Sequence, residues 1–447
     1  MRPITLLRDI WRHRQGLPNQ PRFLTYIVTF RCNARCVMCD CWKKPSPGEL
    51  TLPEIEAIFT QLPRLDAMRL SGGEPFLRPD FLSIAALALE RLRPRLLHVT
   101  TNGFLTRQVV EFCERRPRTA PLALLVSLDG TEAKHNEVRG RPRAWEHAFA
   151  TVRDLAPRQQ ELGLRLGVNQ TIVDPDGLEE HRKLRALLKP LGVPVNAVVA
   201  YATSATYSLE TEAEAAPTAP GEFTTFGHLP PEFATELLAE LEAGLAGRRW
   251  MERLAKRYYL AGLRSRLLHG EPSPNPSCVA LGSHLRLLPN GDVPVCQFNT
   301  RTVGNLRRQR LDSIWNGEPI RREREWVRRC AGCWAECEVL PNALYSGDAV
   351  RHALRSVTMT GRRDTRHGPL TLPSPVRRER VAAGRVRGIF TGEGARRAGE
   401  GNGVGPPGDS PLSRSSRFGG PGLQKLVGRV PEPGVTSDVT PVPGWLP

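Results

Sequence analysis

The chain between residues 22 and 200 alternates short apolar runs with longer amphipathic segments. The apolar runs predict six strands, at Phe23–Thr29, Ala67–Ser71, Leu96–Thr100, Ala123–Ser127, Arg165–Val173 and Pro194–Ala200. The amphipathic segments predict five intervening helices, at Leu52–Leu62, Pro79–Leu92, Leu105–Glu114, Ala144–Leu155 and Leu178–Leu188. Strands that alternate with helices over short connections indicate an α/β fold with a parallel sheet, either doubly wound or barrel-like.

Three further segments follow this strand–helix region. Residues 203–231 are polar and rich in Glu, Ala and Thr, which is typical of a loop or insertion. The stretch Pro231–Leu268 has a helical pattern, and we interpret it as a connector that packs against the sheet. Residues Pro272–Ser346 are rich in cysteine, and we predict that they form a compact unit.

The last part of the chain differs from the rest in composition. From Gly361 to Pro447, Pro and Gly make up 29 of 87 residues without a period, so this segment cannot bury enough apolar surface to fold. We predict a disordered tail and assign it no function. The predicted boundaries are an N-terminal segment 1–21, a core 22–202, a loop and helical connector 203–270, a cysteine-rich domain 271–350 and a low-complexity tail 351–447.

Charge and cysteine content narrow the class of protein. The formal net charge is +17, of which the last 87 residues carry +7 (14 Lys and Arg against 7 Asp and Glu). Much of the basic excess therefore sits in the predicted tail, and nucleic-acid binding is not the favoured interpretation. Eight of the ten cysteines fall in two groups, which favours metal ligation over disulfides. We find no signal peptide or apolar run of membrane-spanning length, so we expect a cytoplasmic protein without a membrane anchor.

Three cysteines directly follow the first predicted strand. Cys32, Cys36 and Cys39 have the spacing Cys-x3-Cys-x2-Cys. Thiolates are soft ligands that suit zinc and iron–sulfur clusters. Three thiolates on a four-iron cluster leave one iron without a protein ligand. An open coordination position is typical of a reactive centre, because a structural site is closed by protein ligands.

More unusual segments fall at or near the ends of later predicted strands. They are Ser71-Gly-Gly-Glu-Pro75, Thr100-Thr-Asn-Gly103, Ser127-Leu-Asp-Gly130 and Asn169-Gln-Thr171. The carboxyl ends of parallel strands share one edge in α/β proteins, and active sites are built at that edge. Each glycine or proline alone is more often an ordinary turn, but their arrangement along one rim predicts a functional site.

The order and spacing of these motifs resemble the radical S-adenosylmethionine (SAM) superfamily, over about residues 23–200. The Cys-x3-Cys-x2-Cys motif, followed about 30 residues later by Gly-Gly-Glu-Pro, carries the resemblance. It implies a partial parallel (β/α)6 barrel, in which the three cysteines hold a [4Fe-4S] cluster and SAM chelates the open iron. One position departs from the pattern. The residue before the third cysteine is often aromatic in this family and here is Met38, which can still cover the adenine through apolar contact.

The resemblance also assigns contacts with SAM to residues of the rim. The cofactor-binding candidates are Gly72, Gly73, Glu74, Pro75, Ser127, Asp129 and Asn169. The Gly-Gly-Glu segment would bind the methionine amine, because backbone carbonyls and a carboxylate suit an ammonium. Ser127 and Asp129 resemble positions that touch the SAM carboxylate or ribose, Asn169 is a weaker candidate, and Asn102 is assigned only to the shape of a turn.

The chemistry that the resemblance implies begins with an electron from a donor such as flavodoxin or ferredoxin. Reductive cleavage of SAM then gives methionine and a 5′-deoxyadenosyl radical, which abstracts a hydrogen atom from the substrate. The barrel would exclude water and hold the target C–H bond near the 5′ carbon.

A second group of cysteines lies in the segment 271–350: Cys278, Cys296, Cys330, Cys333 and Cys337. Cys296 ends a Gly-x4-Cys pattern on a predicted hairpin with a turn at Pro289-Asn290-Gly291. The group resembles the SPASM/twitch extension of radical SAM enzymes, which implies an auxiliary [4Fe-4S] cluster. Five cysteines suit the single-cluster twitch type. We take the first four as the ligands, with Cys337 in reserve or in place of one of them.

Other interpretations of the cysteines stay open at this point. Four thiolates also suit a structural zinc ion, although the neighbouring radical SAM motifs favour iron–sulfur. Cys113 lies in a helical pattern and is predicted to be a core residue, and Cys41 lies close to the first group but outside its motif.

Two hypotheses about function follow. The first is a radical SAM enzyme that acts on an unidentified peptide, protein or small molecule. About 22 residues before the first strand are too few for the fused leader-peptide-binding domain of many peptide-modifying relatives, and Gln297 rather than Asp follows Cys296, which argues against sulfatase maturation. The second is a non-enzymatic zinc-binding module with nucleic-acid contacts.

Overall fold

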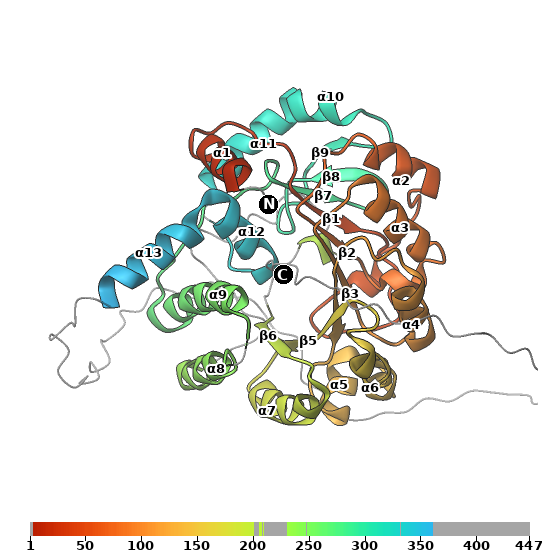
Figure 1. Cartoon of the computed structure of the whole chain (residues 1–447), viewed down its shortest axis with the longest axis vertical. Coiled ribbons are helices and arrows are strands. Elements are labelled where there is room, and N and C mark those ends of the chain that lie inside the picture. The colour runs from red at the N-terminus through yellow and green to blue at the C-terminus, as the bar shows by residue number, and fades with distance from the viewer. Residues whose placement is uncertain are drawn as a thin grey trace, which may run out of the picture. The chain divides into compact units, whose positions relative to one another are not determined.

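One parallel sheet organises the computed structural model, which describes residues 3–200, 205–207, 209, 230–246, 248–330 and 332–360. Seven strands follow the order β6-β5-β4-β3-β2-β1-β7 (Figure 1). They are β1 Phe23–Ile27, β2 Ala67–Ser71, β3 Leu96–Thr101, β4 Leu122–Ser127, β5 Leu164–Ile172, β6 Val195–Val199 and β7 His284–Leu287. All six predicted strands are confirmed to within two residues at each end. The predicted tail beyond residue 360 and most of the predicted loop at 203–231 lie outside the described residues.

The seventh strand was not predicted, and it comes from the cysteine-rich segment. β7 pairs in parallel with β1, with Thr25 opposite Arg286. The predicted turn forms after it, where the N–H of Gly291 donates to the carbonyl of Leu288 at 3.0 Å. The turn leads into β8 (Asp292–Pro294), but the hairpin partner of β8 is the later strand β9 (Thr302–Asn305). The cysteine-rich segment therefore completes the core sheet.

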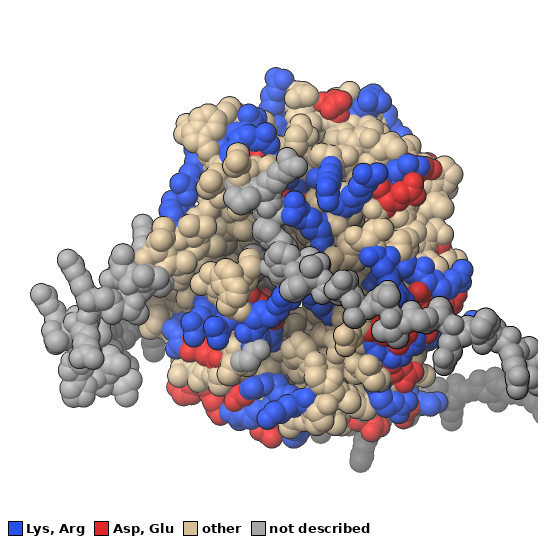
Figure 2. All heavy atoms as spheres, viewed as in Figure 1, with Lys and Arg blue, Asp and Glu red and all other residues tan. Residues whose placement is uncertain are grey.

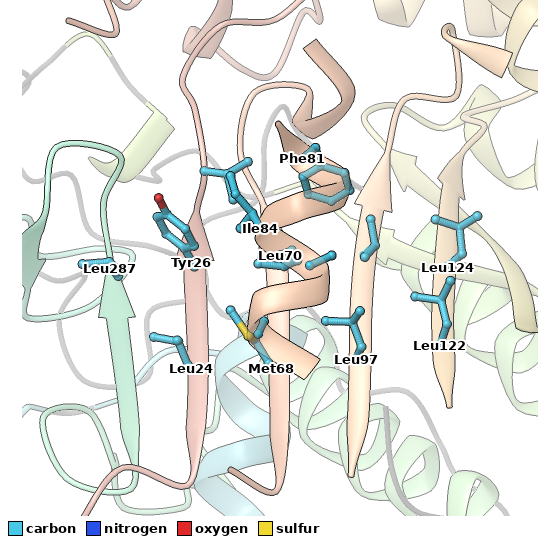
Figure 3. Packing of buried hydrophobic residues seen from close by; sticks show 14 of the residues in the cluster. Leu24, Tyr26, Met68, Leu70, Phe81, Ile84, Leu97, Leu122, Leu124 and Leu287 are labelled. Carbon is cyan, nitrogen blue, oxygen red and sulfur yellow. The ribbon is translucent and has the colours of Figure 1, made fainter. Parts of the chain in front are cut away.

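Helices cover one face of this sheet. They are α2 Leu52–Phe59, α3 Phe81–Arg91, α4 Thr106–Arg115, α5 Glu132–Arg139, α6 Ala144–Leu155 and α7 Asp176–Leu188. Successive side chains of a strand point to opposite faces, so alternate residues pack against these helices. Figure 3 shows this packing for Leu24, Met68, Leu70 and Leu97 with Ile84 of α3. The five predicted helices are present, and the short α5 is an addition.

The other face of the sheet lines the inside of the partial barrel, which we call the lumen. In β2 and β6 the residues of this face are half-buried, whereas their neighbours along each strand are buried. On β1 and β7, by contrast, the residues of both faces are buried, so the lumen is lined by buried side chains on that side of the sheet and by half-buried ones on β2 and β6.

The remaining helices come before β1 or after β6 in the sequence. They are α1 Pro3–Arg14, α8 Pro231–Ala243, α9 Trp250–His269, α10 Leu311–Asn316, α11 Glu318–Arg329, α12 Glu336–Ser346 and α13 Asp348–Thr360. The predicted connector is helical but breaks after α8, where Gly244 follows. The predicted boundary at residue 351 falls inside α13.

A second apolar cluster joins α8, α9 and α12 to β6. Trp334 stacks on Tyr259 at 6.1 Å between ring centroids, and the Arg266 guanidinium lies 3.9 Å from the centroid of the Trp334 ring. A Cβ at Gly262 would lie 1.9 Å from the same indole, so only glycine fits there. This packing fixes the segment that carries the last cysteines against the barrel.

Charged side chains of both signs are interspersed on the face shown in Figure 2. Many form ion pairs between neighbouring helices, such as Arg182 of α7 with Glu236 of α8 at 2.6 Å.

Candidate functional site

The first three cysteines lie on the loop between β1 and α2, at the carboxyl end of the sheet. Burial raises the pKa of the Cys32 thiol to about 12, and the nearby Glu74, Cys36 and Cys39 raise it further. The pKa of Cys39 is lowered to about 7, mainly because the Cys41 thiol hydrogen-bonds to it. The three thiols are therefore close enough to influence one another. Binding a cluster would release protons from them.

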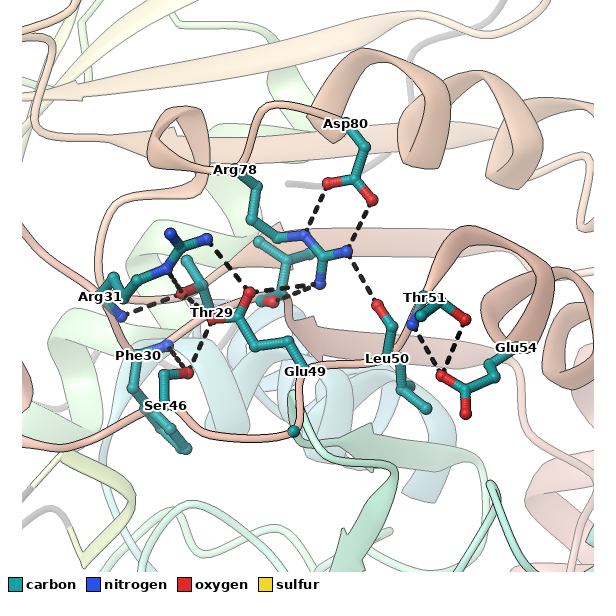
Figure 4. Close-up of polar contacts among 12 residues, drawn as sticks. Thr29, Phe30, Arg31, Ser46, Glu49, Leu50, Thr51, Glu54, Arg78 and Asp80 are labelled. Atoms are coloured by element: carbon teal, nitrogen blue, oxygen red, sulfur yellow. Dashed lines mark hydrogen bonds and ion pairs between the residues drawn. The ribbon is translucent and has the colours of Figure 1, made fainter.

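Contacts at both ends hold this cysteine loop in place (Figure 4). Arg78 is 5% exposed and donates to the carbonyls of Val28 at 3.0 Å and Leu50 at 2.9 Å. Glu49 accepts from the Ser46 hydroxyl at 2.8 Å and from the Thr29 hydroxyl. The loop thus leaves β1 and returns to α2 through a polar clamp that fixes its two ends next to each other.

The glycines after β2 allow close approach to the cysteine loop. The N–H of Gly73 donates to the carbonyl of Thr29 at 2.8 Å, and the N–H of Glu74 donates to that of Arg31 at 2.8 Å. A Cβ at Gly73 would lie 2.2 Å from the Arg31 carbonyl oxygen, and one at Gly72 would lie 2.5 Å from that of Thr29. Larger residues would push the two loops apart.

Glu74 is fully buried, and its carboxylate is held by its own chain. It accepts from the N–H of Phe76 at 3.2 Å, from the Thr101 hydroxyl at 2.8 Å and from the N–H of Asn102 at 2.7 Å. Burial raises the pKa of Glu74 to about 7, against the effect of these hydrogen bonds. In this structure Glu74 ties the end of β2 to the end of β3. Its contact with the amine of SAM stays a prediction.

Asn102 does more than shape a turn. Its side-chain amide donates to the Oδ1 atom of Asn33 at 2.6 Å, and its own Oδ1 accepts from the N–H of Phe104 at 2.9 Å. Because Asn33 follows Cys32 directly, Asn102 connects the end of β3 to the cysteine loop.

Residues of β4 and β5 complete the rim. Ser127 and Asn169 are direct partners in the register of these strands. Asp129 is buried and forms an ion pair with Arg139, at 2.5 Å between Oδ2 and Nε. The Arg139 Nη1 atom in turn donates to the Cys36 sulfur at 3.4 Å. The guanidinium rather than the Asp129 carboxylate therefore faces the cysteine loop.

Arg139 is the functional candidate that the sequence interpretation missed. It is 8% exposed and lies in the last turn of the unpredicted helix α5. In the sequence, Arg139 is recognisable only as an arginine ten residues after Asp129. Its contact with the Cys36 sulfur depends on the fold. A buried guanidinium beside the cysteine loop suits a carboxylate.

The second group of cysteines comes together from distant parts of the chain. Cys278 precedes β7, Cys296 follows β8, and Cys330 and Cys333 follow α11. Burial is the main cause that raises the pKa of each of these four thiols, and the charge of Cys296 adds to the effect on Cys278 and Cys333. These contributions indicate that Cys278 lies near Cys296 and Cys330, and that Cys333 lies near Cys278 and Cys296. That all four bind one cluster stays a prediction.

Cys337 stands somewhat apart from these four. Its thiol donates to the Gln297 side-chain oxygen at 3.3 Å, and the dominant charge acting on it is that of Glu338. Among the described residues no three His, Cys, Asp or Glu side chains converge on a point suited to a single metal ion. Four thiolates suit an iron–sulfur cluster as well as a zinc ion, so the donor set is compatible with the predicted iron–sulfur cluster.

A short segment connects the two cysteine groups. The N–H of Asp40, which follows Cys39, donates to the carbonyl of Tyr207 at 3.1 Å. The N–H of Thr206 donates to the carbonyl of Gln297, which follows Cys296, at 3.0 Å. Thr206 and Tyr207 thus bridge Asp40, which follows Cys39 of the first group, and Gln297, which follows Cys296 of the second group.

Two family models match the chain. The radical SAM superfamily model matches residues 26–187, and the SPASM model, an iron–sulfur cluster-binding domain, matches residues 278–334. The second match includes four of the late cysteines and ends before Cys337. No described helix has the length and apolar character needed to cross a membrane.

Curated relatives share these domains. The chain is 29% identical to an AdoMet-dependent heme synthase of Methanosarcina barkeri over 342 residues, which are 72% of this chain and 93% of the relative. It is 33% identical to a pre-heme d1 synthase of Dinoroseobacter shibae over 147 residues, which are 32% of this chain and 35% of the relative. A mycofactocin maturase of Mycobacterium tuberculosis is 31% identical over 33% of this chain and 38% of its own length.

Solved structures also align with the fold. Native anSMEcpe with bound AdoMet aligns with a TM-score of 0.48 and 16% identity, over 76% of this chain and 98% of that chain. Streptococcus suis SuiB bound to S-adenosylmethionine aligns with a TM-score of 0.47 and 14% identity, over 69% of each chain.

The matched domains imply a [4Fe-4S] cluster with SAM and auxiliary iron–sulfur ligation, and they support SAM-dependent radical chemistry. The non-enzymatic zinc module is not favoured. The chain therefore contains a radical SAM domain at residues 26–187 and a C-terminal SPASM iron–sulfur cluster-binding domain at residues 278–334.

Proposed function

We propose that this enzyme carries out a radical step on a tetrapyrrole during heme assembly. The observation that carries the proposal is the alignment with the heme synthase, which spans 93% of that relative rather than the shared core alone. The pre-heme d1 synthase, whose match covers 35% of its length, supports the same class of small molecule. The half-buried residues on the lumen face of β2 and β6 would be available for recognition of such a substrate.

The proposed cofactor site uses the three cysteines of the β1 loop as cluster ligands. When bound there, the cluster and SAM would supply the capacity for radical hydrogen abstraction from the substrate. The rim residues Gly72, Gly73 and Pro75 bring their backbone to the methionine amine, with Glu74 fixing that backbone. Ser127 and Asn169 line the same rim.

Arg139 is proposed to bind the carboxylate of SAM. The support is its burial, its 3.4 Å contact with the Cys36 sulfur and its charge. Asp129 then acts as a positioning residue, because it holds the guanidinium toward the loop.

The auxiliary cluster is proposed to sit on Cys278, Cys296, Cys330 and Cys333. The support is the mutual influence of these thiols and the extent of the SPASM match. Reduced flavodoxin or ferredoxin would supply the electron, and a cytoplasmic location suits ten free thiols.

The test uses the full chain with reconstituted clusters, under anaerobic conditions, with SAM and a reductant. Mass spectrometry follows 5′-deoxyadenosine together with a panel of iron porphyrins that differ in their peripheral groups. We expect 5′-deoxyadenosine to form and one porphyrin to change mass in step with it. Formation of 5′-deoxyadenosine with every porphyrin unchanged would contradict the substrate proposal and leave the radical chemistry in place.

A further inference from the structure

A row of basic and polar side chains crosses the lumen face of the sheet. The strand register places Arg286 of β7, Thr25 of β1, Arg69 of β2 and His98 of β3 side by side. Their neighbours along each strand belong to the helix-covered core of Figure 3. Because side chains alternate between faces, the row points into the lumen.

One of the two arginines in this row is neutralised. Arg286 forms an ion pair with Glu338 of α12, and Glu338 also lies 3.2 Å from the Nδ1 atom of His284. All three side chains are less than 5% exposed. This buried group joins β7 to α12, and the Glu338 carboxylate is taken up by its contacts with Arg286 and His284.

Arg69 has no such partner. Among the described residues its guanidinium forms no ion pair with a carboxylate; it contacts the backbone carbonyl of Cys337 at 3.4 Å and the ring of Phe23 at 5.2 Å from the centroid. Two guanidiniums, Arg69 and Arg286, thus face one carboxylate, Glu338, and one positive charge is left in excess at the half-buried Arg69.

His98 is the second unsatisfied group, and it is adjacent to Arg69 in the register. The side chain is 6% exposed, and its Nδ1 atom is buried without a hydrogen-bond partner among the described residues. Burial, with a smaller effect of Arg69, lowers the pKa of His98 to about 3, so the imidazole is neutral. An unpaired buried polar atom is costly, and a ligand atom at this position would satisfy it.

We propose that Arg69 and His98 form an anchor for a carboxylate of the substrate. A guanidinium presents a planar pair of donors that matches a carboxylate, and a neutral imidazole adds a further N–H. The rim residue Ser71 lies two residues farther along β2, so the anchored carboxylate would lie roughly 7 Å below the rim. The rest of the substrate would then extend toward the three-cysteine loop.

The site as a carboxylate anchor stands on these contacts, and only the choice of a tetrapyrrole probe rests on the proposed function. The first probe is protoporphyrin IX, which carries two carboxylates, compared with its dimethyl ester in the same detergent. Fluorescence titration of the cluster-loaded full chain measures both Kd values. We expect the wild-type protein to prefer the diacid.

The variants test the anchor directly. We expect Arg69→Met to weaken binding of the diacid about tenfold to a hundredfold and to leave the ester unchanged. Arg69→Lys should recover part of the loss, because it keeps the charge without the planar fork. The matched control is Arg153→Met on α6, an arginine whose side chain is 66% exposed. Iron content and the thermal unfolding temperature of Arg69→Met should match those of wild type, which separates lost binding from lost folding.

A second probe separates this inference from the proposed function. Glutarate should protect Arg69 from modification by phenylglyoxal, as measured by peptide mass spectrometry, and His98→Gln should weaken the protection. If glutarate protects Arg69 but protoporphyrin IX does not bind, the tetrapyrrole proposal fails and the carboxylate anchor stands. Equal binding of diacid and ester, an unchanged Kd in Arg69→Met, or no protection by glutarate would each overturn the anchor.

Discussion

The two groups of cysteines differ in how the chain assembles them. The first three lie within eight residues of one loop, from Cys32 to Cys39. The other four span residues 278–333 and meet only after β7 has joined the core sheet and α11 has packed. Local spacing was enough to recognise the first site, whereas the second depends on tertiary structure.

The surroundings of the two groups also differ. The first group borders the open rim and has the Arg139 guanidinium beside one of its sulfurs. The second group provides four half-buried thiols, enough for protein ligands to close its coordination. We therefore expect the reactive centre at the first site and a supporting role for the second.

The largest expected effect comes from removing a ligand of the first site. Cys36→Ala should lower formation of 5′-deoxyadenosine by at least about a thousandfold, because the radical chemistry needs that cluster. Iron should fall from roughly eight to roughly four atoms per chain. The matched control is Cys113→Ala, a buried cysteine of α4 outside both groups, which should keep all its iron. Full 5′-deoxyadenosine formation in Cys36→Ala would break the assignment.

A pair of variants in the second group tests the choice of ligands. Cys333→Ala should lose about four irons and several kcal/mol of stability, because metal ligation contributes to folding there. Cys337→Ala should keep the iron, because its thiol bonds to Gln297 instead. Iron analysis and thermal unfolding of both proteins give the answer. Loss of iron in Cys337→Ala with retention in Cys333→Ala would reverse the assignment.

The ion pair beneath the first site should matter for stability as well as for SAM. Asp129→Ala leaves the buried Arg139 guanidinium without its partner, which costs about 3–5 kcal/mol. Urea unfolding measures the loss, and the KM for SAM should rise. The exposed Asp154→Ala serves as control and should change stability by less than about 0.5 kcal/mol. Equal stability of the two variants would show that the Asp129–Arg139 pair contributes little.

The raised pKa of Glu74 predicts that the stability of the metal-free protein depends on pH. This pKa is raised from 4.5 to about 7 in the folded state, so the folded state binds the proton more tightly than the unfolded state. The free energy of unfolding should therefore fall by up to about 3 kcal/mol as the pH rises from below 4.5 through 7. The slope should be absent in Glu74→Gln, which cannot titrate. Parallel pH profiles of the two proteins in urea unfolding would contradict the raised pKa.

The smallest effect is expected from the end of the chain. Deletion from Gly361 onward should leave the iron content and 5′-deoxyadenosine formation within about twofold of the full chain, because both cysteine groups precede it. The rates of the two proteins are compared at equal iron loading. A large loss of activity in the truncated protein would assign the tail a role.

Helices and strands with a regular apolar period were predictable, and those without one were not. The predicted strands succeed because their alternate residues pack against helices. Helix α5 was missed because only a few of its residues, such as His135 and Val138, are buried, so its sequence carries a weak period. Arg139 was missed with it. β7 was missed because its four residues, which alternate polar and apolar side chains, make too short a run to stand out in the sequence.

The sequence by itself determined the α/β pattern, the first three cysteines and the glycine segment that follows β2. These features are local, because they depend on spacing within one strand, helix or loop. Tertiary structure decided which distant residues meet: Arg139 with Cys36, the four late cysteines with one another, and Arg69 with His98 in the lumen. Such contacts depend on strand order and register, which no local pattern encodes. Both groups of cysteines were recognised in the sequence, but one loop assembles the first, whereas only the folded chain can bring the second together.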